Sequence, residues 1–137
     1  MTRKESKTTT CNTADARAHL TSATQFLTAL DTLDASEIPI SNDVLATTAI
    51  HAAIAAADAI CCARRQQHSS SGNHNDAAEL LKTIDKQLGG ELAKVLGYKN
   101  SAAYSTRETS PDQVKTCRRV AKSLVEAAQQ AVQRATG

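Results

Sequence analysis

The sequence predicts an all-α fold, a bundle of four long helices and one short helix around a central alanine-rich helix. The stretch 41–67 is small or apolar on nearly every side, which is typical of a helix without a solvent-facing surface. Elsewhere apolar residues recur every three or four positions, and the sequence shows no strand-like alternation. Aromatic residues make up 2% of the 137 residues, so the core must consist of Ala, Leu, Val and Ile, which suits closely packed helices.

The first two predicted helices are joined by a short connection. Residues 1–11 lack periodicity and are expected to form a disordered tail, so that a single helical-bundle domain covers 12–137. The first helix is expected at 12–33, and Pro39 prevents its continuation. Ser41 is a favourable N-cap for the central helix that follows.

Three more helices are expected after a polar loop at 66–75. The third helix is predicted at 73–87, where the Gly89–Gly90 pair breaks it, and a short helix follows at 91–104. The last helix has the clearest start signal, because residues 110–113 (SPDQ) place Ser at the cap, Pro at the first helical position and Gln at the third. It is expected to reach about residue 134. Its predicted buried face consists of Val114, Cys117, Ala121, Leu124, Val125, Ala128 and Val132.

Charge and cysteine content limit the class of protein. Lys plus Arg number 16 against 14 for Asp plus Glu, and this net charge of +2 is too small to indicate nucleic-acid binding by itself. No uncharged apolar run of membrane-spanning length and no signal peptide are recognised, so we expect a cytoplasmic protein that does not associate with membranes. The cysteines lack a framework spacing and are expected to be reduced, buried thiols; they are Cys11, Cys61, Cys62 and Cys117.

Several stretches occur together in a recognisable order. An alanine-rich helix at 46–64 is followed by a polar loop, and His74 then stands ahead of a Leu-Leu pair in HNDAAELL. KNSAAY at 99–104 and SPDQVKTCRRVAKSLVEAA at 110–128 follow. Together these stretches resemble the HEPN superfamily of small helical bundles. The likeness covers about residues 14–132 and is greatest to small stand-alone bacterial bundles. It implies a HEPN-like bundle that forms a homodimer around the motif region.

The resemblance also identifies a motif in which two residues differ from the catalytic pattern. Catalytic members are metal-independent ribonucleases with Arg, four to six residues, then His, often with Asn after the Arg. The matching positions here are Lys99, Asn100 and Tyr104. Lys retains the charge but not the bidentate geometry of Arg, and Tyr, with a pKa near 10 in model peptides, is a poor base at neutral pH. We therefore expect no catalytic residues here, and interpret these three positions as an altered motif pocket.

Two polar residues of the central helix form a second candidate site. His51 and Asp58 are seven residues apart, so they share one face of the helix. One interpretation is an internal polar pocket completed by Tyr104 or an arginine. The other, which we favour, is structural: Asp58 pairs with a basic residue of a neighbouring helix, and His51 binds a carbonyl.

A metal site is not predicted. Structural zinc sites contain a Cys-x2-4-Cys unit, whereas adjacent cysteines on a helix diverge. The residues considered for such a site are Cys61, Cys62, His68 and His74. We expect no metal and no cofactor.

The start of the last helix carries a basic face. Its predicted anion-binding residues are Lys115, Arg118, Arg119 and Lys122, with Arg107 nearby. A solvated outer face is the alternative, and we favour it because Glu126 and Gln129 continue the face and no aromatic side chain is interleaved.

The sequence is compatible with three functions. We favour a non-catalytic HEPN-like binding module whose ligand is RNA, a nucleotide or a nucleotidyltransferase-type partner protein. The alternatives are a toxin-like ribonuclease with an altered motif and a structural adaptor whose alanine-rich surfaces pack on a partner. Incubation with RNA in the absence of metal separates the first two, since only a ribonuclease cleaves the RNA.

Overall fold

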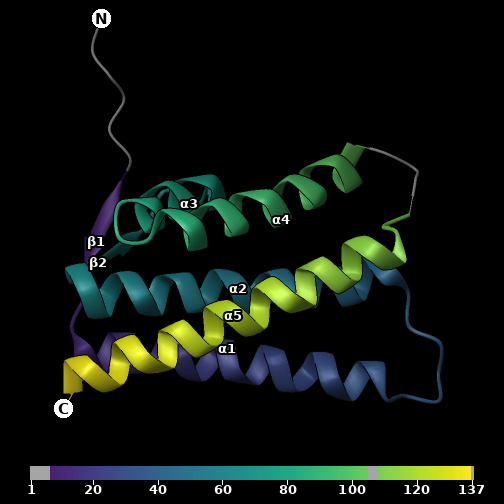
Figure 1. Ribbon diagram of the computed structural model, residues 1–137, viewed down its shortest axis with the longest axis horizontal. Coiled ribbons are helices and arrows are strands. Elements are labelled where there is room, and N and C mark those ends of the chain that lie inside the picture. Colours follow the sequence, from purple (N-terminus) through teal and green to yellow (C-terminus); the bar gives the residue numbers. More distant parts are fainter. Residues whose placement is uncertain (1–6, 105–107, 137) are drawn as a thin grey trace, which may run out of the picture.

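The described residues of the protein form five α-helices and one small antiparallel sheet (Figure 1). The computed structural model describes residues 7–104 and 108–136, with the backbone alone described at 99–104. In chain order the elements are β1 (Thr8–Thr10), α1 (Thr13–Asp34), α2 (Asn42–Arg65), β2 (Gln67–Ser69), α3 (His74–Lys82), α4 (Lys86–Tyr104) and α5 (Pro111–Thr136). The all-α prediction is confirmed. The short helix is α3, however, and not the helix that contains 91–104.

Helix α2 is the centre of the bundle. It packs chiefly against α1 and α5, and more lightly against α3 and α4 (Figure 1). Thirteen of its residues are buried, and seven of the thirteen are alanines, which let the neighbouring helices approach closely. By length and composition α2 is apolar enough to cross a membrane, but 72% of its most apolar window is buried inside the bundle. Most of this window is therefore covered by the other helices of the bundle.

Side-chain caps fix where three helices begin. Asn12 accepts a hydrogen bond from the backbone N–H of Asp15, and Asp15 accepts one from the N–H of Asn12, each at 2.9 Å. Ser41 accepts from the N–H three residues later at 3.3 Å, as expected for an N-cap. Ser110 and Gln113 form the predicted capping box, with N···O distances of 3.0 and 3.1 Å. All seven residues of the predicted apolar face of α5 are buried.

The Gly89–Gly90 pair does not break a helix, which corrects the prediction. The chain turns earlier, at 83–85, and the Asp85 carboxylate accepts from the N–H of Leu88 at 3.0 Å at the start of α4. Gly89 is needed for packing instead, because a Cβ added there would lie 2.4 Å from Cγ of Lys82 and 2.6 Å from its backbone N. A side chain at this position would push the end of α3 away from α4.

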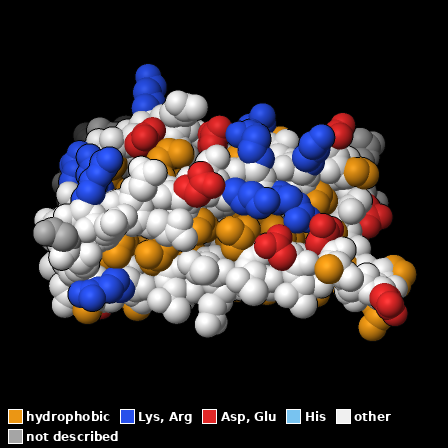
Figure 2. All heavy atoms as spheres, turned by 60° about the horizontal axis from the view of Figure 1, so that its bottom comes forward, with side chains coloured by type: hydrophobic (Ala, Val, Ile, Leu, Met, Phe, Trp, Pro, Cys, Tyr) orange, Lys and Arg blue, Asp and Glu red, His pale blue; other side chains and the backbone are white. Residues whose placement is uncertain are grey.

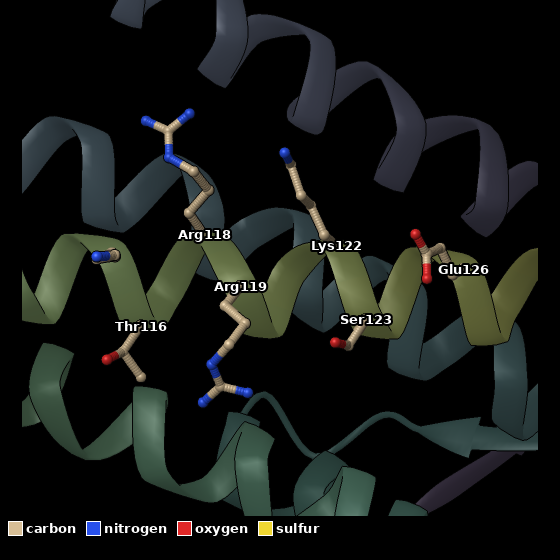
Figure 3. Close-up of a pocket in the computed structure, with 7 residues that line it drawn as sticks. Thr116, Arg118, Arg119, Lys122, Ser123 and Glu126 are labelled. Carbon is tan, nitrogen blue, oxygen red and sulfur yellow. The ribbon is translucent and has the colours of Figure 1, made fainter.

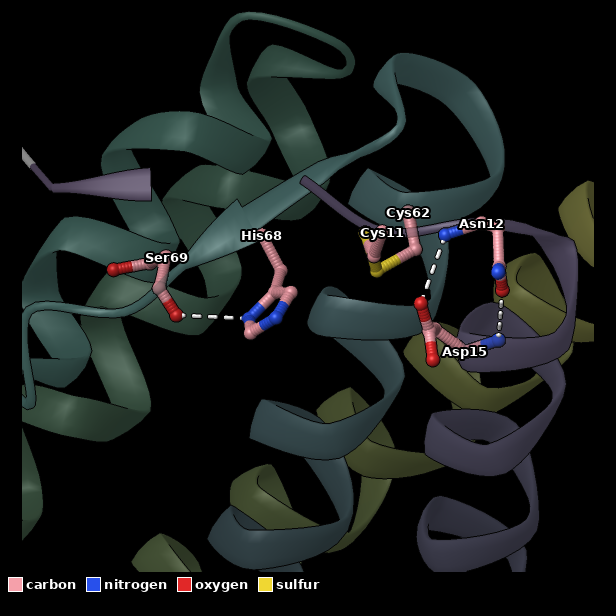
Figure 4. The surroundings of a disulfide bond; sticks show 6 residues. All are labelled: Cys11, Asn12, Asp15, Cys62, His68 and Ser69. Atoms are coloured by element: carbon pink, nitrogen blue, oxygen red, sulfur yellow. Dashed lines mark hydrogen bonds between the residues drawn. A yellow bond between two sulfur atoms is a disulfide. The ribbon is translucent and has the colours of Figure 1, made fainter. Parts of the chain in front are cut away.

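The segment before α1 is also more ordered than predicted. Thr8–Thr10 pair with Gln67–Ser69 as antiparallel strands, and Cys11 forms a disulfide with Cys62 at the end of α2 (Figure 4). The expectations of a disordered tail reaching residue 11, of no strands, and of four reduced cysteines were therefore wrong for these residues. Cys61 and Cys117 are free and buried, as expected.

Candidate functional site

The outer face of α5 forms a shallow basic groove between α1 and α4. Burial of the apolar stripe of α5 leaves the residues on its opposite side directed outward. The groove has a volume of about 520 Å³. Its lining residues are Lys115, Thr116, Arg118, Arg119, Lys122, Ser123 and Glu126. We refer to this surface as the α5 groove.

Basic side chains lie in a row along this face with carboxylates next to them (Figure 2). In the close-up, Arg118 and Lys122 extend toward α1, whereas Arg119 and Thr116 extend toward α4 (Figure 3). The structure thus brings together four of the five residues of the predicted anion site. Arg107, the fifth, lies outside the described residues.

The two arginines of the α5 groove are held in ion pairs by neighbouring helices. Arg118 lies 3.6 Å from Asp31 and 3.2 Å from Asp34 at the end of α1. Arg119 donates to Glu91 of α4 at 3.0 Å. All five side chains keep part of their surface in water, so each pair contributes little stability, about 0–1 kcal/mol. Their main effect is to fix where the two guanidinium groups lie.

The two lysines of the groove are in a different situation. Lys115 and Lys122 are exposed, and no carboxylate of the described residues lies within ion-pairing distance of either. They stand seven positions apart, which places them roughly 10 Å apart along the helix axis. Thr116 and Ser123 add hydroxyl groups beside them. The groove therefore offers two available cations, two arginines whose partners are exchangeable, and hydrogen-bonding hydroxyls.

A second contact fixes the start of α5 against the start of α2. The backbone N–H of Thr109 donates to the Asp43 carboxylate at 2.9 Å, and the Thr109 hydroxyl donates to the same oxygen. These two hydrogen bonds, the hydroxyl one first, lower the pKa of Asp43 below its usual value. No local signal in the sequence indicated this contact, because the two residues are 66 positions apart.

The altered motif residues lie at the end of α4. The backbone of Lys99, Asn100 and Tyr104 is helical. Their side chains lie outside the described part of the chain, so the pocket predicted there stays a prediction.

His51 and Asp58 contact different neighbours. The His51 ring stacks on Phe26 of α1, with ring centroids 5.4 Å apart and planes at 22°. Asp58 lies close enough to His68 of β2 for their charges to interact, and burial, partly offset by this histidine, raises the pKa of Asp58 to about 6. None of the ion pairs formed by the described residues includes Asp58.

A histidine pair near Asp58 was not anticipated. His19 of α1 and His68 have ring centroids 5.1 Å apart at 59°. Burial and the neighbouring His68 lower the pKa of His19, while Asp15 opposes that shift. Nδ1 of His68 lies 3.0 Å from the carbonyl oxygen of Ser69 (Figure 4). Within the described ranges, no three His, Cys, Asp or Glu side chains are arranged to hold a metal ion.

No protein-family model, curated protein or solved structure matches the chain. The assignment of function therefore depends on the geometry of the bundle and its α5 groove.

Proposed function

We propose that the protein is a non-catalytic, HEPN-like binding module that binds RNA through its phosphate backbone along the α5 groove. The main support for the proposal is how the four basic side chains of the groove are paired. Lys115 and Lys122 have no carboxylate partner among the described residues, and Arg118 and Arg119 flank them in solvent-accessible ion pairs. Together these groups form a strip that matches a chain of phosphates better than a single anion.

The spacing of the lysines favours a polymer over a mononucleotide. Two cations roughly 10 Å apart on one helix face reach different phosphates of an extended strand. None of the described residues that line the groove is aromatic, so the groove offers no side chain there on which a base could stack. Binding is thus expected to depend on the backbone charge, to be sensitive to salt and to show little sequence preference.

The HEPN assignment adds an expectation about assembly. An alanine-rich central helix followed by a capped basic last helix supports it, and the family forms homodimers near the motif region at 99–104. A dimer would present two α5 grooves to one RNA. A cytoplasmic location is part of the same proposal, because RNA is available there.

Titration of a fluorescein-labelled single-stranded RNA, followed by anisotropy at several salt concentrations, tests the proposal. Lys115→Gln with Lys122→Gln should weaken binding by roughly tenfold and should reduce the slope of log K against log salt by about 1.4, since each phosphate contact contributes about 0.7. Gel analysis of the same RNA reports any cleavage; none is expected.

The matched control removes two lysines elsewhere. Lys86 and Lys94 are exposed residues of α4 that do not line the groove. Replacing both by Gln makes the same change in net charge. The logarithm of the binding constant should fall by less than half of the decrease seen for Lys115→Gln with Lys122→Gln. Equal losses in the two double variants would mean that binding is a non-specific charge effect, and absence of RNA binding by the wild type would refute the proposal.

A further inference from the structure

The disulfide closes the open end of a helical hairpin. Helices α1 and α2 are joined by the loop at 35–41, and the Cys11–Cys62 bond links the start of α1 to the end of α2 at the opposite end (Figure 4). Both cysteines are buried, with 5% and 1% of their surfaces exposed. The bond thus sits at a defined junction between the bundle and the segment that precedes it.

The segment that the disulfide holds has little else to keep it in place. All three residues of β1 are exposed, and β1 pairs with a strand of only three residues. The ladder is extended by hydrogen bonds from Cys11 N–H to the Gln66 carbonyl at 2.9 Å and from Ser70 N–H to the Lys7 carbonyl at 3.1 Å. An isolated two-stranded ladder is marginally stable in water. Residues 7–11 are therefore expected to separate from β2 when the covalent link is absent.

The packing of α1 against α2 does not depend on the disulfide alone. Ala16, Ala23 and Leu30 of α1 are fully buried in the core formed with α2. The capping box of Asn12 and Asp15 starts α1 immediately after Cys11. Loss of the disulfide should consequently release the strand without separating the two helices.

The remaining thiols do not compete for the bond. Cys61 and Cys117 are buried, and burial raises the pKa of Cys61 to about 12 and that of Cys117 to about 11. Asp58 contributes to the rise at Cys61. Because the thiolate is the attacking species, neither cysteine can exchange readily with the bridge. Only a thiol from outside the protein remains as a partner.

We propose that Cys11–Cys62 is a reversible redox latch that fastens strand β1 to the end of α2 and releases it on reduction by a dithiol. The thiolate of the dithiol attacks Sγ of Cys11 when β1 frays; the S–S bond breaks, and Sγ of Cys62 leaves as a thiolate that takes up a proton. The second thiol of the dithiol then displaces Sγ of Cys11 from the mixed disulfide. Two electrons and two protons pass to the protein, in which Cys11 and Cys62 become thiols, and the dithiol becomes a cyclic disulfide. This latch is independent of the RNA-binding proposal.

The outcome of release is a change in the surface at one end of the bundle. In the oxidised form β1 covers one edge of β2, the strand that carries His68 and contacts α1 through His19. In the reduced form this edge of Gln67–Ser69 is open to solvent. The bundle thereby has two surface states under redox control.

The test compares the wild-type chain after oxidation with glutathione disulfide and after reduction with dithiothreitol. Alkylation under denaturing conditions should modify two cysteines in the oxidised protein and four in the reduced one. Hydrogen exchange should become at least tenfold faster at the amides of Cys11 and Ser70 on reduction, and should return to its initial rate on reoxidation. Amides in the middle of α2, such as Ala53 and Ala56, should remain protected in the reduced protein and should accelerate only as far as the loss of global stability requires.

Two variants serve as references. Cys62→Ser should exchange like the reduced wild type under both conditions, and Cys61→Ser should respond to the reductant like the wild type. Four alkylated cysteines after oxidation, unchanged exchange at residues 7–11 on reduction, or loss of protection throughout α1 and α2 would each overturn the latch. The last result would identify the bond as a structural requirement of the bundle.

Discussion

Asp58 shows how one side chain determines a pH dependence of stability. Burial raises its pKa in the folded protein to about 6, above the model value of 3.8. The native state therefore holds a proton more tightly than the unfolded state between these values. The stabilisation from neutral Asp58 is present below about pH 3.8 and is lost as the pH rises through about 6.

Substitution of Asp58 by Asn removes this titration. We expect the variant to be more stable than the wild type by about 2 kcal/mol at pH 8, since solvent screens part of the charge of the partly exposed Asp58. At pH 3.5, where Asp58 is neutral, the variant should gain nothing. Urea denaturation at both pH values measures the difference. A gain of equal size at both would show that the charge of Asp58 is not its cause.

Gly89 and Gly90 provide a matched pair of residues. Both lie in α4, but a Cβ at Gly89 would lie 2.8 Å from Cα of Lys82. A Cβ at Gly90 would have no such neighbour within 4 Å among the described residues. Gly89→Ala should lower the free energy of unfolding by about 2 kcal/mol, as is usual when a packed contact is overfilled. Gly90→Ala should raise it by about 0.5–1 kcal/mol through helix propensity. Thermal unfolding measures both, and equal effects would contradict the close approach of α3 and α4.

At the scale of elements, the α5 groove depends on how three helices meet. The carboxylates of α1 and α4 compete with any external anion for Arg118 and Arg119. The groove is therefore a partly neutralised site whose cations are positioned in advance. This arrangement predicts that loss of a competing carboxylate strengthens binding.

Glu91→Gln tests that competition. It frees the guanidinium of Arg119 without removing a cation, so RNA affinity should rise by about three- to fivefold at low salt. Glu79→Gln on α3 is the control. It also removes one carboxylate, but this carboxylate lies outside the groove and pairs with Lys82 at a distance of 2.9 Å. A similar rise in both variants would attribute the effect to net charge alone, whereas no rise in either would indicate that Arg119 does not contact the RNA.

At the scale of the whole molecule, the disulfide links residues 51 positions apart, which in the chain-entropy model corresponds to about 4 kcal/mol of stabilisation. Cys11→Ser should lose an amount of this order in urea denaturation. The wild type reduced with dithiothreitol should lose the same amount, because it lacks the same cross-link and Ser is close to Cys in size. A reduced wild type that is as stable as the oxidised one would contradict this estimate.

The sequence was most informative where structure is local. Caps at Ser41 and Ser110 and the buried stripe of α5 follow from residues within a few positions of one another, and the structure confirms them. The glycine pair was misread because the close approach of Lys82, which explains Gly89, is a tertiary contact. Neighbouring cysteines on a helix gave no sign that Cys62 has a partner before α1.

In the candidate site, too, the sequence predicted the local features but not the contacts between distant residues. Helical periodicity alone placed Lys115, Arg118, Arg119 and Lys122 on one face. The carboxylates of α1 and α4 that pair with the arginines are 28 or more residues away in the sequence, and nothing local connects them. The contact between His19 and His68 similarly requires that α1 and β2 be brought together by the fold.

The most direct measurement of the central claim is a titration of ¹⁵N-labelled protein with unlabelled single-stranded RNA, followed by ¹H–¹⁵N spectra. The account predicts that chemical-shift changes concentrate at Lys115–Glu126 of α5 and at the adjoining parts of α1 and α4, and that they shrink as salt is added. Changes confined to another surface, or an unchanged spectrum at RNA excess, would contradict the assignment of the α5 groove as the binding site.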